Sequence, residues 1–383
     1  MKIQKEKAVD FLQRLIRINS VNPPGNELEV AEAIAAHTKE AGLQTKVKKF
    51  ANGRANILVR VKGKDASQKP FVFSGHLDTV PIGANPWDYD PFSGEVVDGK
   101  LYGRGACDMK SGVAALIEAM IMIKSSGNQP RRDIIFAGTA GEEVDCIGAK
   151  ALIKDGDINN AGAIMIAEPS NRKVFNAHKG ALWIELKVFG KTAHGSMPEQ
   201  GSNAIVHMNE LLHRLKRYDF TSVKEHHLLG KPTLNIGTIS GGTGTNVVPD
   251  QCTVTVDIRT TPEVIHEAII NDFHRLLEEM EKEIKECKVE LNVMNDLPAL
   301  ANEENNHFVQ LALDVNHDLY GMPKEEKGAN YYTDASVYGP ALNVPIVIYG
   351  PSDERLAHQP NEYVEIKQYF KAIEYYATMA MKY

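Results

Sequence analysis

Cysteine is scarce in this 383-residue chain. The four cysteines stand too far apart for a disulfide framework or a CxxC metal site, so we expect reduced thiols at Cys107, Cys146, Cys252 and Cys287. Only Cys107 stands beside a candidate functional residue, Asp108, and we expect no chemical role for the other three.

Blocks of basic residues and long apolar runs are also missing. The formal charge of -7 is modest and spread along the chain, so nothing would attract nucleic acid. No stretch approaches the ~18 uncharged apolar residues of a membrane span. Residues 1–15 alternate charged and apolar side chains, unlike the apolar core of a signal peptide. We therefore expect a cytoplasmic protein that binds neither nucleic acid nor membrane.

The chain does have enough apolar residues for a large core. Its hydrophobic content is 43%, and its length exceeds the ~250–300 residues at which single cores stop growing, so we expect two domains. Helical spacing over 27–41 and an apolar stretch over 109–123 alternate with strand-like runs at 56–61, 71–75, 133–138 and 163–167. This alternation predicts an α/β domain with a mostly parallel, doubly wound sheet.

A different pattern begins near residue 181. It reads as strand 182–189, helix 203–217, strands 233–239 and 252–258, a helix with Thr261 as N-cap and Pro262 at its first position, and strand 288–293. This β-α-β-β-α-β order predicts a ferredoxin-like α+β unit. A strand at 344–350 and a final helix from about 364 restore the first pattern. We predict a discontinuous catalytic domain (1–179 and 295–383) with an inserted domain (180–294).

Residues able to bind metal follow the predicted strands. His76 and Asp78 come after 71–75, the pair Glu142 and Glu143 after 133–138, and Glu168 after 163–167. His358 follows 344–350, and Asp108 lies in a glycine-rich turn before a helix. Because ligands bind at the carboxyl ends of strands in open α/β sheets, folding could gather these side chains at one edge.

Imidazoles mixed with carboxylates suit zinc, cobalt or manganese, and a carboxylate can bridge two such ions. Neighbours in a loop cannot easily both point at one ion, so one of Glu142 and Glu143 would bind metal while the other takes a proton from water. Asp78, two residues past His76, could fix the tautomer of that imidazole. The pattern predicts a two-metal hydrolase.

At these residues the chain resembles the co-catalytic zinc amidohydrolases, which include succinyl-diaminopimelate desuccinylase, acetylornithine deacetylase, aminoacylase and glutamate carboxypeptidase. The matching stretches are SGHLDTVP (74–81), GRGACDMKSG (103–112), TAGEEVDCIGA (139–149), AEPS (167–170) and LAHQPNE (356–362). Five segments in the family's order and spacing are far more specific than any single motif.

The resemblance implies roles for these residues. His76 and Glu168 would hold one Zn2+, Glu143 and His358 the other, and Asp108 would bridge them, with Co2+ or Mn2+ as possible substitutes. Glu142 would be the general base and Asp78 the orienter of His76.

The resemblance also implies roles in the inserted domain, which would be a lid and dimerisation module. His194 in TAHGSMP (192–198) would stabilise the oxyanion, in cis or across a homodimer. Asn246 and Arg259 would bind the substrate carboxylate. Lys179 could also pair with that carboxylate.

The expected reaction is hydrolysis of an N-acyl amino acid by a metal-bridging water that Glu142 activates. Segments AHKGA (177–181), YTDAS (332–336) and YGPSDERLAHQ (349–359) favour N-succinyl-diaminopimelate, and hence lysine biosynthesis, or N-acetylornithine. A dipeptidase or general aminoacylase on the same scaffold is the alternative. A metal-bound binding module without turnover is a remote third, disfavoured by the intact Glu142.

Other features have structural interpretations. The glycine-rich segment 239–246 lacks a phosphate-loop pattern. Nine histidines are expected to serve packing or the surface: His37, His207, His213, His226, His227, His266, His274, His307 and His317.

Overall fold

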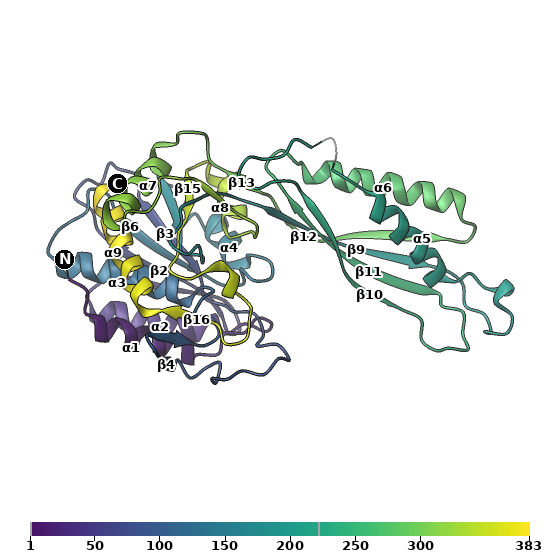
Figure 1. Cartoon of the computed structure of the whole chain (residues 1–383), viewed down its shortest axis with the longest axis horizontal. Helices are drawn as coiled ribbons and strands as arrows, with labels where there is room; N and C mark the ends of the chain where they lie inside the picture. The colour runs from purple at the N-terminus through teal and green to yellow at the C-terminus, as the bar shows by residue number, and fades with distance from the viewer. Residues whose placement is uncertain (1, 221–222) are drawn as a thin grey trace. The chain divides into compact units, whose positions relative to one another are not determined.

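The structure of the chain is a computed structural model that describes residues 2–220 and 223–383. It divides into two compact units. Unit 1 consists of Met1–Ala177, Asn302–Gly328 and Thr333–Tyr383, and unit 2 of His178–Ala301 and Ala329–Tyr332. The chain therefore leaves unit 1 and returns to it (Figure 1).

Unit 1 contains a mixed sheet with parallel strands at its centre. The strands run in the order β1 (Gln44–Ala51), β2 (Arg54–Val61), β6 (Ile134–Thr139), β3 (Phe71–His76), β7 (Ala163–Ile166), β15 (Ile346–Ile348) and β8 (Phe175–His178). The four strands from β6 to β15 are parallel to one another, and those on either side are antiparallel. The α/β prediction is confirmed, with antiparallel strands added on both sides of the parallel centre.

The composition of the central strands explains their position. β3 and β7 are buried at every residue, as expected for apolar runs covered on both faces of a sheet. The helices of this unit are α1 (Lys5–Arg17), α2 (Glu27–Glu40), α3 (Lys110–Ser125), α4 (Ile147–Asp155), α7 (His307–Tyr320), α8 (Ala335–Leu342) and α9 (Ile366–Lys382). In Figure 1, α4 and α8 lie on the opposite side of the sheet from α3 and α9.

A small second sheet of unit 1 joins two distant parts of the chain. It has the order β16 (Tyr363–Glu365), β5 (Lys100–Tyr102) and β4 (Val96–Val97). Val364 pairs with Leu101 in β5, so the final helix predicted from about residue 364 begins two residues later. Strand pairing fixes the backbone there, and the helix begins at Ile366.

Unit 2 has the predicted ferredoxin-like order. The elements are β9 (Gly180–Phe189), α5 (Ala204–Arg217), β10 (Thr233–Gly241), β11 (Gln251–Thr260), α6 (His266–Glu283) and β12 (Lys288–Leu297). The sheet order is β10-β11-β9-β12, entirely antiparallel. Alternate residues of β9 and β11 are buried against α5 and α6, so one face is packed and the other is wetter.

The predicted start of α6 is wrong. Thr261 and Pro262 lie in a turn, and the helix begins at His266. The Thr260 hydroxyl and the His266 ring are 2.7 Å apart, and Asp296 lies 2.6 Å from the other ring nitrogen. This tertiary contact holds the segment before His266 as a turn, whereas the Thr-Pro signal alone favours helix.

The remaining short elements are β13 (Leu300–Ala301), β14 (Lys327–Ala329), η1 (Pro198–Gln200) and η2 (Glu354–Leu356). Across the described ranges, no helix is both long and apolar enough to span a bilayer.

Candidate functional site

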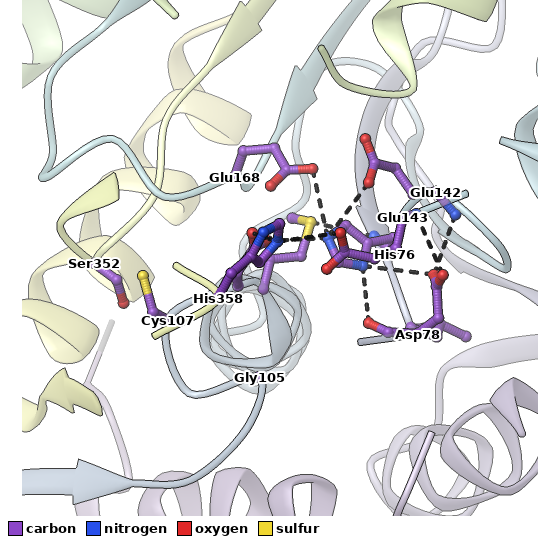
Figure 2. A network of polar contacts seen from close by, with 12 residues as sticks. His76, Asp78, Gly105, Cys107, Glu142, Glu143, Glu168, Ser352 and His358 are labelled. Carbon is purple, nitrogen blue, oxygen red and sulfur yellow. Dashed lines mark hydrogen bonds and ion pairs between the residues drawn. The ribbon is translucent and has the colours of Figure 1, made fainter. Parts of the chain in front are cut away.

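The predicted metal ligands of unit 1 lie together at the carboxyl edge of the parallel strands. His76 ends β3, Glu142 and Glu143 follow β6, and Glu168 stands two residues past β7. Asp108 precedes α3 and His358 lies between η2 and β16. Figure 2 shows the labelled members of this set converging from segments far apart in the sequence: His76, Glu142, Glu143, Glu168 and His358.

Two groups of side chains have metal-binding geometry. The first consists of His76, Asp108 and Glu168, and the second of Asp108, Glu143 and His358. Within each group the donor atoms all lie within 4.8 Å of one another. Asp108 belongs to both groups, as a bridging carboxylate would.

The two oxygens of Asp108 face different histidines. Oδ1 lies 3.0 Å from Nε2 of His76, and Oδ2 lies 3.3 Å from Nε2 of His358. His76 Nε2 is also 3.7 Å from Glu168 Oε1, while His358 Nε2 is 3.2 Å from Glu143 Oε2. The Asp108 carboxylate therefore lies between His76 and Glu168 on one side and Glu143 and His358 on the other.

Burial of so many carboxylates raises several pKa values. Burial is the main cause that lifts the pKa of Glu142 and Glu168 well above the usual range, and the pKa of Glu143 rises for the same reason. Burial also pushes the pKa of Asp108 upward, but hydrogen bonds from His358 and His76 outweigh it and the pKa is lowered.

The donor set fits a pair of divalent cations. Glu143 Oε1 is buried without a hydrogen-bond partner, which is costly unless a cation approaches it. Carboxylates and imidazoles together are ligands typical of zinc or manganese. Metal binding by these residues stays a prediction, although the structure brings all five together.

Glu142 lies beside the first group. Its Oε2 is 4.0 Å from His76 Nε2, and the residue is only 5% exposed. Its neighbour Glu143 points at His358 instead, so the adjacent pair divides between two positions. This is the division expected if one glutamate binds metal and the other handles protons.

Asp78 has a wider role than the sequence suggests. His76 Nδ1 lies 3.0 Å from the backbone carbonyl of Asp78 and 3.6 Å from its carboxylate. The carboxylate accepts hydrogen bonds from the backbone N–H groups of Gly141, Glu142 and Glu143. Asp78 therefore holds the loop that carries the two glutamates as well as touching His76.

Sequence reasoning missed four residues around this site: Asn22, Arg104, Asp334 and Glu362. Asn22 donates to the Asp78 carboxylate at 2.9 Å. Asp334 accepts from the Thr139 hydroxyl at 2.6 Å, and burial raises the pKa of Asp334 to about 6. Arg104 and Glu362 lie in segments 103–112 and 356–362, which carry the family resemblance, and Asp334 lies in segment 332–336, so these positions were the available signal. Asn22 had none.

Cys107 is a poor nucleophile because its thiol is held in the protonated form. Burial raises the pKa of its thiol well above the usual range, and Sγ lies 3.2 Å from the Asp353 carbonyl. All four cysteines are free and buried.

Two of the predicted substrate-contacting residues in unit 2 are neighbours. Gly195, next to His194, donates its N–H to the Asn246 carbonyl at 2.8 Å. The N–H of Ser196 donates to His194 Nδ1 at 3.1 Å. A backbone N–H can only donate, so in the neutral ring the proton sits on Nε2, which can then donate to an oxyanion. The catalytic role of His194 stays a prediction.

Lys179 and Arg259 also share a region of unit 2. Lys179 is buried and donates to the Lys231 carbonyl at 2.8 Å, and burial together with Arg259 lowers its pKa. Arg259 Nε lies 2.9 Å from Asp257. A substrate carboxylate would therefore have to meet the terminal nitrogens of Arg259.

The fold and the buried group of carboxylates and imidazoles define a metal-dependent hydrolase. Residues 72–382 match Peptidase family M20/M25/M40, and the chain belongs to that family. It is accordingly an enzyme that hydrolyses linear amide C–N bonds and depends on metal.

Individual relatives agree over nearly the whole chain. A protein named "Probable succinyl-diaminopimelate desuccinylase" from Staphylococcus aureus (strain N315) is 28% identical over 99% of this chain and 98% of its own length. An acetylornithine deacetylase from Aliivibrio fischeri (strain MJ11) is 27% identical, with 93% of each chain covered. A tripeptidase structure from Staphylococcus aureus shares the fold, with a TM-score of 0.80, 24% identity and coverage of 99% and 98%.

Proposed function

We propose that this chain is a two-zinc amidohydrolase that cleaves an N-acyl amino acid, with N-succinyl-diaminopimelate or N-acetylornithine as substrate. The observation that carries the proposal is the position of Asp108 between two ligand groups with Glu142 beside them. The names of the full-length relatives support an N-acyl amino acid as substrate.

The metal ligands would divide as the distances divide them. His76 and Glu168 would hold one Zn2+, Glu143 and His358 the other, and Asp108 both. When bound, the two ions would polarise the substrate carbonyl and make water acidic enough to react near neutral pH. Co2+ or Mn2+ could take their place.

Glu142 would move the protons of the reaction. It would accept a proton from the attacking water, whose oxygen bonds to the carbonyl carbon, and would then deliver that proton to the amine nitrogen as the C–N bond breaks. The products would be a carboxylic acid and a free amine. Asp78 would keep Glu142 in place through the hydrogen bonds that its carboxylate accepts from three backbone N–H groups.

Residues of unit 2 would bind and stabilise the substrate. His194 would donate from Nε2 to the developing oxyanion, which needs donors held in place beforehand. Asn246, Arg259 and Lys179 would contact the substrate carboxylate, and the guanidinium suits a planar acceptor.

We also propose a homodimer through unit 2, acting as a lid and dimerisation domain. β10 is an edge strand whose residues are mostly exposed, and α5 leaves Val206 61% exposed. Unpaired strand edges and exposed apolar side chains are common sites of association. Light scattering at micromolar concentration should give twice the chain mass, and a Val206→Lys variant should shift toward monomer. A wild-type monomer would contradict the proposal.

The role of Glu142 can be tested with an isosteric variant. Glu142→Gln keeps the shape but cannot accept the proton, so kcat should fall by a factor of about 10²–10⁴ or more. Zn2+ content, measured by elemental analysis, should remain two per chain. Turnover near the wild-type rate would refute the assignment.

The substrate can be tested by comparing initial rates on N-succinyl-diaminopimelate, N-acetylornithine and a peptide panel, each with a chelated control. Preference for one of the first two, lost on chelation, is the expected result. If di- or tripeptides were hydrolysed faster than both N-acyl amino acids, the chain would instead be a peptidase on this fold.

A further inference from the structure

A buried ion pair of unit 1 lies next to the metal-binding groups without being part of either. Arg104 and Glu362 are 2% and 1% exposed, and Arg104 Nη1 donates to Glu362 Oε2. A buried ion pair is weak evidence for stability, because desolvation offsets the attraction between the charges. The contacts around the pair indicate what it does.

Glu362 holds the loop that carries Asp108. This Asp108 loop (residues 103–109) directs three backbone N–H groups at Glu362 Oε1, from Gly105, Cys107 and Asp108, at 3.0, 2.8 and 2.9 Å. One carboxylate oxygen thus fixes the backbone at Asp108 itself.

Arg104 connects the same loop to its neighbours. Nη2 donates to the Pro81 carbonyl at 3.1 Å, three residues past Asp78. Its terminal nitrogens also lie 3.5 Å from the carbonyls of His358 and Gln359 in the His358 loop (residues 357–362). The Trp87 ring lies 5.1 Å from the guanidinium carbon. The pair therefore contacts the Asp108 loop, the His358 loop and the segment at Pro81 that follows His76.

Strand pairing explains why these loops meet. β5 leads into the Asp108 loop and β16 follows the His358 loop, and Tyr102 pairs with Tyr363. Gly103 also donates its N–H to the Glu362 carbonyl at 2.9 Å. The register of two short strands thus places the Glu362 side chain beneath the Asp108 loop.

We propose that Glu362 is a positioning residue that, with Arg104, holds the Asp108 and His358 loops in the geometry that binds the metal pair. This inference rests on the proposed two-metal function. Asp78 holds the Glu142–Glu143 loop in the same way, so each of the two acidic loops would be held by one buried carboxylate. Loss of Glu362 should therefore weaken metal binding and leave substrate binding unchanged once metal is saturating.

The test is Zn2+ affinity, measured on metal-stripped full-length protein by competition with a chromophoric chelator. In Glu362→Gln the amide can direct its oxygen at the loop or at Arg104, but not at both. Zn2+ affinity should fall about 10–100-fold, as removal of outer-shell partners commonly does. At saturating Zn2+, kcat should return to within a few-fold of wild type with KM unchanged.

Asp133→Asn provides the matched control. Asp133 also pairs with an arginine, Arg60, and accepts a backbone N–H, from Gly63 at 2.7 Å, but it precedes β6 at the end opposite the glutamates. The Asp133→Asn substitution should lower the free energy of unfolding without changing Zn2+ affinity. If Glu362→Gln does not fold by circular dichroism, Arg104→Lys takes its place, because lysine keeps the charge but loses the fork. That variant should bind Zn2+ several-fold more weakly.

The outcomes separate the two proposals. If wild type does not bind two Zn2+ ions, the two-metal function fails. If wild type binds two but the folded Glu362 or Arg104 variant binds them equally well, only the positioning role is overturned.

Discussion

Gly112 lies where the first turn of α3 packs against the segment that leads to Glu168. A Cβ added at Gly112 would stand 2.1 Å from the backbone carbonyl oxygen of Ala167, whereas real Cβ contacts are essentially never shorter than 3.0 Å. The obstacle is backbone, so no side-chain rotation can relieve it. Gly112→Ala must therefore separate α3 from the end of β7.

The expected cost follows from two opposing terms. Overpacking a core costs about 1–3 kcal/mol, and a clash with backbone belongs at the upper end of that range. Alanine is a better helix former than glycine by about 1 kcal/mol, which offsets part of the cost. We expect the free energy of unfolding to fall by about 2 kcal/mol.

The same displacement should reach the metal site, because Asp108 precedes α3 and Glu168 follows Ala167. Zn2+ affinity should decrease along with stability.

Urea unfolding is the assay for stability. Each unit contains one of the two tryptophans, Trp87 in unit 1 and Trp183 in unit 2, so a Trp183→Phe background reports unit 1 alone. Gly244→Ala is the control, because its Cβ would meet nothing closer than 3.6 Å. Gly244 lies in unit 2, so this variant is read from Trp183 in a Trp87→Phe background. If Gly112→Ala matched or exceeded wild-type stability and Zn2+ affinity, the packing argument would be refuted.

Three further predictions concern pH, capping and metal. Burial lowers the pKa of His178 to about 4, below the unfolded value of about 6.5, so the unfolded chain binds the proton more tightly. The free energy of unfolding should therefore be highest above pH 6.5 and fall by about 3 kcal/mol as the pH is lowered to 4. Stability curves of wild type and His178→Gln should therefore converge toward pH 4, and parallel curves would refute this. Asn203 caps α5 by accepting hydrogen bonds from the N–H groups of Ile205 and Val206, so Asn203→Ala should lower the free energy of unfolding of unit 2 by about 1 kcal/mol. Unfolding of unit 2 is read from Trp183 in a Trp87→Phe background, and an unchanged free energy would count against the cap. Removing Zn2+ held at 100 times its dissociation constant should cost unit 1 about 2.7 kcal/mol, and an unchanged Tm after chelation would argue against the metal site.

Local patterns in the sequence are sufficient to predict the elements with strong periodicity and the candidate catalytic and metal-binding residues. β3, β6 and β7 are short apolar runs, and the alternation in β11 has a period of two, so their types follow from local pattern. The candidate ligands were identified because each follows such a run or lies in a glycine-rich turn. The family resemblance supplied the catalytic and metal-binding roles of these residues. Those roles stay predictions where geometry is their only support.

Tertiary structure decided what depends on contacts between distant segments. The start of α6 is set by the contact of His266 with Thr260 and Asp296, and the start of α9 by the pairing of Val364 with Leu101. Likewise, only the fold shows that Asp78 and Glu362 each hold an acidic loop through three backbone N–H groups. A backbone N–H carries no signature in the sequence, so partners separated by up to 257 positions become visible only when the chain is folded.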